Sequence, residues 1–482
     1  MSTLTERLTT PIPSGPGRGR RRGLIGFGAA VLALVLLYVL PGGELSPHGR
    51  AALVVFAAAV LAWMFAPVDD TFVGLVAALA LVFTGVIGPD TLFGALGDET
   101  IWLLVAAFVL AGGLAATGLP ARAAVALVSR ARTVRQLAHL VTVALVVTAL
   151  AIPATSGRAA LALPVFVALA KSLRRRESVV RALAILFPSV ILLSAIASLI
   201  GAGAHLITSQ VLAETTGSGI GFGRWLLLGL PFAVVSSHCA AEVVLLLTTT
   251  RADRRRPLSI ETRELGVPGG EPLTSAQRRA LIVLGGVILL WCTESLHGIG
   301  PAVVALAGAL VITTPRLGTT GLGRQLESVP WSLLLFMATT AVLGSALVSS
   351  GAAHWLTGLV FGGGLPASGF LVLVVVLSAG AHLVLQSRSA RSSVLVPLVI
   401  PLASAAGFNP AAIAFVSTVA AGFCHTLPSS AKPVALFAAV EGVPTYDRRD
   451  LLRLSAVLGP LVVLLVLGFA RFVWPALGLS LH

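Results

Sequence analysis

Charged residues are scarce in this sequence. Only 11% of its 482 residues are Asp, Glu, Lys or Arg, whereas 56% are hydrophobic. An ordinary soluble domain carries about 25% charged residues, and so few polar side chains could not coat a soluble core of this size. The composition excludes a soluble enzyme or a disordered tail protein. It indicates an integral membrane protein whose main solvent is lipid.

Cysteine is also rare, with three residues in the chain. Cys239, Cys292 and Cys424 lie in apolar stretches, too far apart along the sequence for a metal-binding motif. We therefore expect all three to be small buried residues.

Enzyme motifs are absent from the sequence as well. It has no Gly-x-Ser-x-Gly elbow, no Walker loop, no His-Glu-x-x-His and no Rossmann glycine pattern. We expect no enzymatic activity and no cofactor. An intramembrane hydrolase that uses Ser and His is the remaining enzymatic alternative, although no spacing suggests its nucleophile and base.

Apolar runs of membrane-spanning length follow one another along the chain. A helix needs about 20 apolar residues to cross a bilayer. An Arg-rich run precedes the first candidate, and no small-x-small cleavage site follows it, so we expect a helix rather than a signal peptide. We predict an all-α integral membrane protein with about eleven transmembrane helices: 24–40, 50–67, 71–88, 100–117, 187–212, 223–249, 279–297, 299–315, 331–349, 410–440 and 452–474.

Polar interruptions break several of the apolar segments, at 153–158, 386–391 and 428–433. Irregular backbone at membrane depth is tolerated only inside protein or beside a watery cavity. We therefore predict two re-entrant hairpins, 137–173 and 366–406, and two split helices, 187–212 and 410–440, around one site. The alternative is pairs of short helices joined by ordinary surface loops.

Basic residues lie mostly in loops that this topology places on one membrane face. By the positive-inside rule, we predict that the N-terminal tail 1–23 and the linker 250–278 are cytoplasmic, and that the C-terminus is extracytoplasmic. The protein would then be a multi-pass protein of the cell membrane. The net charge of +14 does not indicate a nucleic-acid partner, because no basic groove interleaved with aromatic residues is present.

The two halves of the chain share short motifs at an offset of 233 residues. Ser156-Gly-Arg158, within the first predicted hairpin, corresponds to Ser389-Ala-Arg391 in the second, and both runs end at a proline. In the predicted topology the two copies enter the membrane from opposite sides. Because inverted repeats with broken helices are typical of secondary transporters, we predict an inverted repeat of 24–249 and 279–482.

These motifs resemble those of the divalent anion/sodium symporter family, which carries dicarboxylates, citrate or sulfate. The likeness covers the chain from about residue 50, with marks at 93–102, 118–122 and 331–351. The hairpin tips stand where the family has Ser-Asn-Thr-Ala-Thr, and 200–209 and 428–433 stand at its split-helix motifs. The resemblance implies a homodimer with elevator-like transport domains, whose tips and split helices bind sodium and whose tips also hold substrate carboxylates.

The tips depart from the family pattern. Neither keeps the Asn; Arg388 takes an Asn place, and Arg158 and Arg391 take Thr places. A fixed guanidinium repels sodium, so we expect weak sodium dependence, with at most one sodium site at the first tip. Protons are the alternative coupling ion, and His238 and Glu242, four residues apart on one helix face, could relay them.

The three arginines are the strongest indication of a binding site. A guanidinium binds carboxylate, sulfate or phosphate through two parallel hydrogen bonds, and helix N-termini at the tips favour anions. The alternative is that the arginines hydrogen-bond helix carbonyls. Lys432 could contact the substrate or extend to the interface. The predicted substrate-binding residues are Thr155, Ser156, Arg158, Ser387, Arg388, Ser389 and Arg391, and the predicted cation- or proton-coupling residues are Thr155, Ser156, Gly201, His205, Thr208, Ser209, His425, Ser429 and Ser430.

From these features we predict a secondary transporter that moves a small anion, namely a dicarboxylate, a tricarboxylate or sulfate, across the cytoplasmic membrane. An uncoupled anion channel or facilitator is the alternative. The predicted partners are the anionic substrate, the lipid bilayer and a second copy of the chain.

Overall fold

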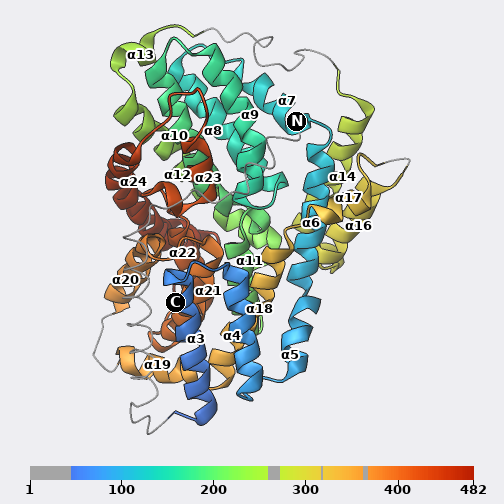
Figure 1. Cartoon of the computed structure of the whole chain (residues 1–482), viewed down its shortest axis with the longest axis vertical. Coiled ribbons are helices and arrows are strands. Elements are labelled where there is room, and N and C mark those ends of the chain that lie inside the picture. The colour runs from blue at the N-terminus through green and yellow to red at the C-terminus, as the bar shows by residue number, and fades with distance from the viewer. Residues whose placement is uncertain (1–44, 259–271, 316–317, 362–366) are drawn as a thin grey trace.

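The computed structural model describes residues 45–258, 272–315, 318–361 and 367–482, and these residues form helices without a β-strand (Figure 1). This confirms the prediction of an all-α membrane protein. Eight helices of the described ranges are long and apolar enough to cross a membrane, and five apolar helices are shorter. The predicted span 24–40, the tail 1–23 and residues 259–271 of the linker 250–278 lie outside the described residues, so the count of eleven spans stays a prediction.

Short loops connect the helices of the first half of the chain. Several begin at a capping side chain, as α6 does, where Asp98 accepts a hydrogen bond from the Thr100 N–H. The helices are α3 (Pro47–Phe65), α4 (Asp70–Phe83), α5 (Pro89–Gly94), α6 (Glu99–Ala115), α7 (Leu119–Val128), α8 (Val134–Ala151), α9 (Thr155–Ser172), α10 (Glu177–Leu193), α11 (Gly203–Thr216), α12 (Phe222–Thr248) and α13 (Arg251–Arg255).

The second half repeats the pattern of long helices and interruptions. Its helices are α14 (Ser275–Cys292), α15 (Glu294–His297), α16 (Pro301–Thr313), α17 (Leu322–Glu327), α18 (Trp331–Ser349), α19 (Ala352–Phe361), α20 (Ala367–Gly380), α21 (Arg388–Ala405), α22 (Pro410–Ala421), α23 (Lys432–Ala438), α24 (Arg448–Gly468) and α25 (Trp474–Ala476). Contacts between the halves are extensive, because α6 packs on α16, α4 on α18, and α11 on α21.

The prediction that all cysteines are buried is wrong for Cys292, which is exposed at the end of α14. Cys424 is buried and Cys239 is half-buried. The reason is that α14 buries few of its side chains and leaves an apolar surface such as Ile282 and Leu289 uncovered. In a membrane protein, lipid rather than protein can cover such a surface.

Each predicted interruption is a break between helices. The chain leaves the helical conformation at 152–154 between α8 and α9, and at 384–387 between α20 and α21. The two split helices are α10 with α11, covering 177–216 rather than 187–212, and α22 with α23. Whether the hairpins are re-entrant depends on the position of the bilayer and stays a prediction.

The two split helices have the same backbone conformation at their breaks. A 3₁₀ turn, Leu199–Gly201 in the first and Pro428–Ser430 in the second, precedes the second half-helix. The residue before that turn has φ −134° and ψ 144° in the first copy, and φ −131° and ψ 151° in the second. The residue after it has φ −156° and φ −160°. Unlike sequences therefore adopt one backbone path, which supports the predicted repeat.

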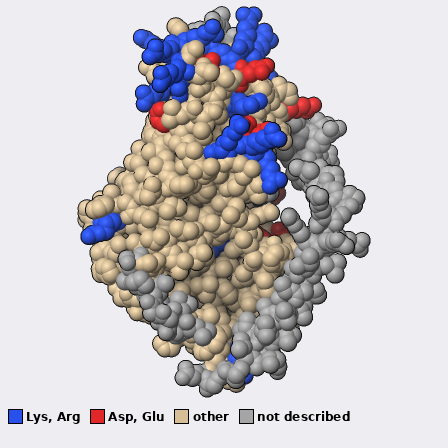
Figure 2. Space-filling view, turned by 90° about the vertical axis from the view of Figure 1, so that its left-hand side faces the viewer, with Lys and Arg blue, Asp and Glu red and all other residues tan. Residues whose placement is uncertain are grey.

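The arrangement of the helix pairs also agrees with an inverted repeat. In Figure 1, α8 and α9 lie in the half of the molecule that carries α13, whereas α20 and α21 lie in the opposite half. Figure 2 shows Lys and Arg side chains gathered at one end of the molecule, which is the α13 end. The predicted hairpins thus approach the centre of the molecule from opposite ends.

Candidate anion-binding site

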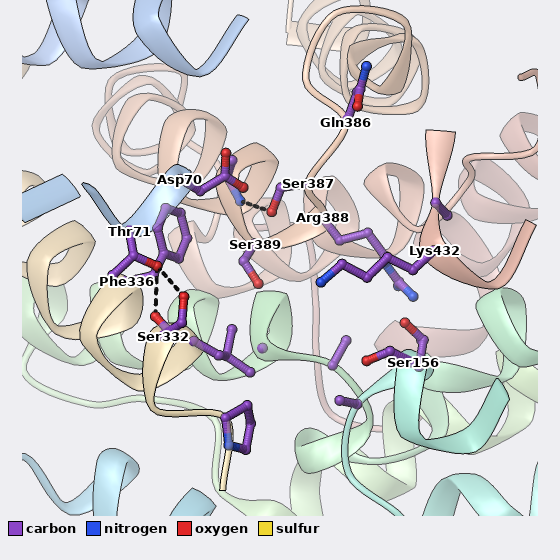
Figure 3. A pocket seen from close by; sticks show the side chains of 18 of the residues that line it. Asp70, Thr71, Ser156, Ser332, Phe336, Gln386, Ser387, Arg388, Ser389 and Lys432 are labelled. Carbon is purple, nitrogen blue, oxygen red and sulfur yellow. Dashed lines mark hydrogen bonds between the residues drawn. The ribbon is translucent and has the colours of Figure 1, made fainter. Parts of the chain in front are cut away.

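A cavity of about 1070 Å³ lies where the helix breaks meet. Its wall includes both predicted hairpin tips, at 152–157 and 385–390, and the starts of α11 and α23. The turn between α3 and α4 and the first turn of α18 form the rest of the polar wall (Figure 3). Segments far apart in the sequence therefore share one chamber in the interior of the molecule.

Three of the helices that begin at this cavity are α9, α11 and α21. No side chain caps α9 or α11, while in α21 the Ser387 Oγ accepts a hydrogen bond from the Ala390 N–H at 3.3 Å. First-turn N–H groups have no partner within their own helix, and the helix dipole places partial positive charge there. These helix starts therefore favour an anion in the cavity.

The first tip has an unusual backbone. Ala154, directly before α9, has a φ of 63°, and it is the only non-glycine residue with positive φ in the described ranges. Residues other than glycine rarely adopt this backbone conformation, which costs of order 1–3 kcal/mol. The surrounding structure holds this strained residue at the cavity wall, directly before Thr155 and Ser156.

Two cationic side chains enter the cavity. Arg388, the first residue of α21, donates from Nη1 to the Leu192 carbonyl at 3.2 Å. Its Nε has no hydrogen-bond partner in the described part of the chain. Lys432 is the first residue of α23. Figure 3 shows both side chains reaching the same part of the chamber, facing Ser156.

Five of the predicted substrate-binding residues line this cavity. The hydroxyl groups among them come from both tips and surround the two cations with short polar side chains, which can donate to an anion. The five are Thr155, Ser156, Ser387, Arg388 and Ser389.

Arg158 lies away from the cavity wall and is 1% exposed. Its guanidinium donates to the Leu145 carbonyl at 2.6 Å and to the Ile191 carbonyl at 2.9 Å. It also donates to the Ser194 Oγ at 2.6 Å and the Thr148 Oγ1 at 3.2 Å. Arg158 therefore ties the first predicted hairpin to the end of α10, and the geometry favours the carbonyl-binding alternative.

Arg391 has the corresponding position in the second repeat and is fully buried. Its Nη1 donates to the Ala421 carbonyl at 2.6 Å and to the Phe423 carbonyl at 3.1 Å, where α22 ends. In each repeat, then, the tip arginine binds carbonyls at the end of the first half of the split helix. Both arginines satisfy backbone groups that lipid could not.

The predicted coupling residues on the split helices have other partners. The Thr208 hydroxyl hydrogen-bonds to the Thr418 hydroxyl at 2.6 Å. The Ser209 Oγ lies 3.0 Å from the Ile220 carbonyl oxygen and 3.0 Å from the Ile220 nitrogen. Gly201 is required for packing, since a Cβ there would lie 2.1 Å from the Ala195 carbonyl oxygen. None of these three residues lines the cavity, although the break itself adjoins the first tip, where the Ala154 N–H donates to the Ile200 carbonyl, next to Gly201, at 3.4 Å.

The two predicted split-helix histidines are buried outside the cavity wall. His205 stacks on Trp225, with ring centroids 5.1 Å apart, and its Nδ1 lies 3.0 Å from the Ser198 carbonyl. His425 Nε2 lies 3.5 Å from the Ser189 carbonyl. The Ser430 Oγ accepts a hydrogen bond from the Leu427 N–H at 3.1 Å. The side chain of Ser429 lies outside the described part of the structure.

His238 and Glu242 belong to a separate cluster between α8 and α12. His139 joins them, with its Nδ1 2.7 Å from the His238 Nδ1 and its Nε2 2.6 Å from a Glu242 oxygen. Arg135 also binds Glu242 at 2.6 Å. None of these residues lines the cavity. Within the described residues, no group of three or more His, Cys, Asp and Glu side chains is suited to hold a metal ion.

Sequence reasoning missed the wall formed by α4 and α18. Asp70 begins α4 and lines the cavity, and the neighbouring Thr71 hydroxyl lies 2.7 Å from the Ser332 hydroxyl (Figure 3). The available signal was the pair Asp69-Asp70 between two apolar runs. These two residues fall between the predicted spans 50–67 and 71–88, and none of the sequence motifs assigned them a role.

The family model for the sodium:sulfate symporter transmembrane region matches residues 24–480. The chain belongs to this family. It is therefore a multi-pass membrane transporter, and members of this family are transporters rather than enzymes. This confirms the resemblance seen in the hairpin and split-helix motifs.

Individual proteins support the assignment. A membrane protein of Cupriavidus necator is 26% identical over 94% of this chain and 93% of its own length. Dicarboxylate transporter 2 of the chloroplast of Spinacia oleracea is 26% identical over 68% of this chain and 60% of its own length. The crystal structure of the YdaH transporter of Alcanivorax borkumensis has a TM-score of 0.57 at 17% identity, covering 94% of this chain and 99% of YdaH, so the fold is shared.

Proposed function

We propose that the transporter carries a small dianion, a dicarboxylate or sulfate, bound in the cavity by Arg388, Lys432 and the starts of α9, α11 and α21. The single observation that carries this proposal is the meeting of both cations with the three helix starts in one chamber. The chloroplast dicarboxylate transporter among the relatives supports the same class of substrate. A tricarboxylate belongs to the same chemistry and is included in the test.

We also propose that transport does not require sodium. Arg388 supplies at the second tip a fixed positive charge that would repel sodium. The split-helix hydroxyls of Thr208 and Ser209 are engaged in protein hydrogen bonds. A sodium site at the first tip would therefore depend on Thr155 and Ser156, the two hydroxyl residues that line the cavity there.

The proposed architecture is an inverted repeat of about eleven spans and two re-entrant hairpins, in a homodimer that works by an elevator-like movement. The equal backbone conformation of the two split-helix breaks supports the repeat. The Lys and Arg side chains at the α13 end (Figure 2) support a cytoplasmic location for that end, with the C-terminus on the other side.

Counterflow in proteoliposomes tests the proposal. Vesicles loaded with unlabelled sulfate, succinate or citrate should take up the labelled anion from the outside medium by exchange. The rates of uptake should be equal in sodium, potassium and choline. A channel or facilitator of the pore type would not show counterflow, and a steep sigmoidal sodium dependence would contradict sodium independence.

Two matched variants locate the site. Lys432→Gln and Arg388→Gln should each weaken anion binding by about 1.5–3 kcal/mol, the usual value for a hydrogen bond to a charged group, or about tenfold or more. Lys171→Gln is the control, because Lys171 is exposed at the end of α9, away from the cavity. Wild-type affinity in both cavity variants would place the anion elsewhere.

A further inference from the structure

The charges on the cavity wall balance. The charged residues that line the described cavity are Arg388, Lys432, Asp69 and Asp70. With all four ionised their sum is zero, so the charged side chains give a dianion no net attraction and leave only that of the helix starts. If one carboxyl group takes up a proton, the sum becomes +1. Anion binding and proton binding in this chamber are therefore linked by electrostatics.

Asp70 is the better placed of the two carboxyl groups. Asp69 is exposed and serves as the N-cap of α4, where its Oδ1 accepts a hydrogen bond from the Thr71 N–H at 2.9 Å. That role requires an acceptor oxygen. Asp70 is only partly exposed, is not the cap, and interacts with the Ser387 hydroxyl at the second tip.

The Ser387 hydroxyl connects Asp70 to the start of α21. Its oxygen accepts the Ala390 N–H, which leaves its proton to be donated to the Asp70 carboxyl group. Arg388 follows directly in the chain. Figure 3 shows Asp70 beside Ser387, on the opposite side of Arg388 from Ser156. An anion held by Arg388 would thus lie in the same chamber as the Asp70 carboxyl group.

The charged and titratable groups around Asp70 include no better proton acceptor than its own carboxyl group. Asp69 precedes it on the chain, Lys432 acts on it from α23, and Arg388 lies at the start of α21. Trp63 of α3 donates a hydrogen bond to the Asp70 carbonyl oxygen, and the Ser332 hydroxyl of α18 hydrogen-bonds to the Thr71 hydroxyl. Neither Trp63 nor Ser332 titrates near neutral pH. Asp90 of α5 follows the far end of α4.

We propose that Asp70 is the proton-binding residue of this transporter, taking up one proton when a dianion enters the cavity. The proton comes from water on the side from which the anion binds, and it leaves when the anion is released. No bond other than the O–H of the carboxyl group forms or breaks. The proposal rests on the proposed anion site and adds proton coupling to it.

Proton uptake by the purified protein tests the proposal without a variant. Sulfate or succinate added to detergent-solubilised wild-type protein in weak buffer at pH 6.5 should raise the pH, with one proton taken up per anion bound. Anion binding without proton uptake would overturn the proposal, while it would leave the anion site itself intact.

The variant Asp70→Asn separates coupling from binding. In the wild type the Kd for sulfate or succinate should rise by up to about tenfold per pH unit as pH increases, which is the slope for one linked proton. In Asp70→Asn the Kd should change by less than about twofold over the same range. Asp70→Glu should restore the slope, and Asp90→Asn is the matched control on an exposed helix start.

Two results would overturn the role of Asp70. The first is a wild-type slope retained in Asp70→Asn, which would assign the proton to another group such as His238. The second is a pH-independent Kd in the wild type. If Asp70→Asn does not fold, Asp70→Ser takes its place, with the same loss of the pH slope expected.

Discussion

Replacing Arg158 by methionine should destabilise the protein and leave its anion affinity unchanged. The guanidinium makes four hydrogen bonds that join α8, α9 and the end of α10. At about 1.5 kcal/mol each, the lower value for bonds with a charged partner, their loss amounts to about 6 kcal/mol. Removing a cation from the membrane interior regains about 3 kcal/mol. The net destabilisation should be about 3 kcal/mol.

The assay is thermal unfolding in detergent in a Cys239→Ser and Cys292→Ser background, so that a thiol-reactive fluorophore reports the exposure of buried Cys424. Arg388→Met serves as the comparison, because Arg388 makes one hydrogen bond within the described residues, to the Leu192 carbonyl. Arg158→Met should unfold at a clearly lower temperature than Arg388→Met, while only the latter should lose anion affinity. A stable Arg158→Met with weakened anion binding would refute this reasoning and return Arg158 to the substrate site.

Three further experiments test the breaks and the pairing of the split helices. Ala154→Gly should stabilise the protein by about 1 kcal/mol in thermal unfolding, because glycine adopts the positive φ without strain; no gain would argue against strain at the tip. Gly201→Ala should prevent the close approach to the Ala195 carbonyl oxygen and lower the yield of folded protein in size-exclusion chromatography, whereas Gly285→Ala, where the added methyl group has open space, should not. In a double-mutant cycle, Thr208→Val and Thr418→Val should show a coupling energy of about 1 kcal/mol; additive effects would exclude their hydrogen bond.

The sequence predicted where the helices break, because a polar run within an apolar segment must be surrounded by protein. It did not distinguish the three arginines. Arg388 lines the cavity, whereas Arg158 and Arg391, each the fourth residue of its helix, face the helix ends behind the tips. A residue's position within the first turn determines which way its side chain points, and this depends on where each helix begins, which the sequence indicated only to within several residues.

Asp70 and Lys432 were not assigned from the sequence because their role comes from tertiary packing. They lie more than 300 residues apart in the chain and meet only through the packing of α4 and α23 around one chamber. The likeness of the two split-helix breaks was similarly hidden, since Leu-Ile-Gly and Pro-Ser-Ser share a backbone conformation without sharing side chains.

Chemical modification of Lys432 tests the central claim most directly. The chain contains two lysines, Lys171 and Lys432, so Lys171→Arg leaves one lysine side chain, in the cavity, and mass spectrometry can follow its reaction with an amine-reactive reagent. The account predicts that sulfate or succinate slows this reaction at the concentrations that half-saturate transport, while chloride at equal ionic strength does not. Modification at the same rate with and without a transported anion would contradict an anion site at Lys432.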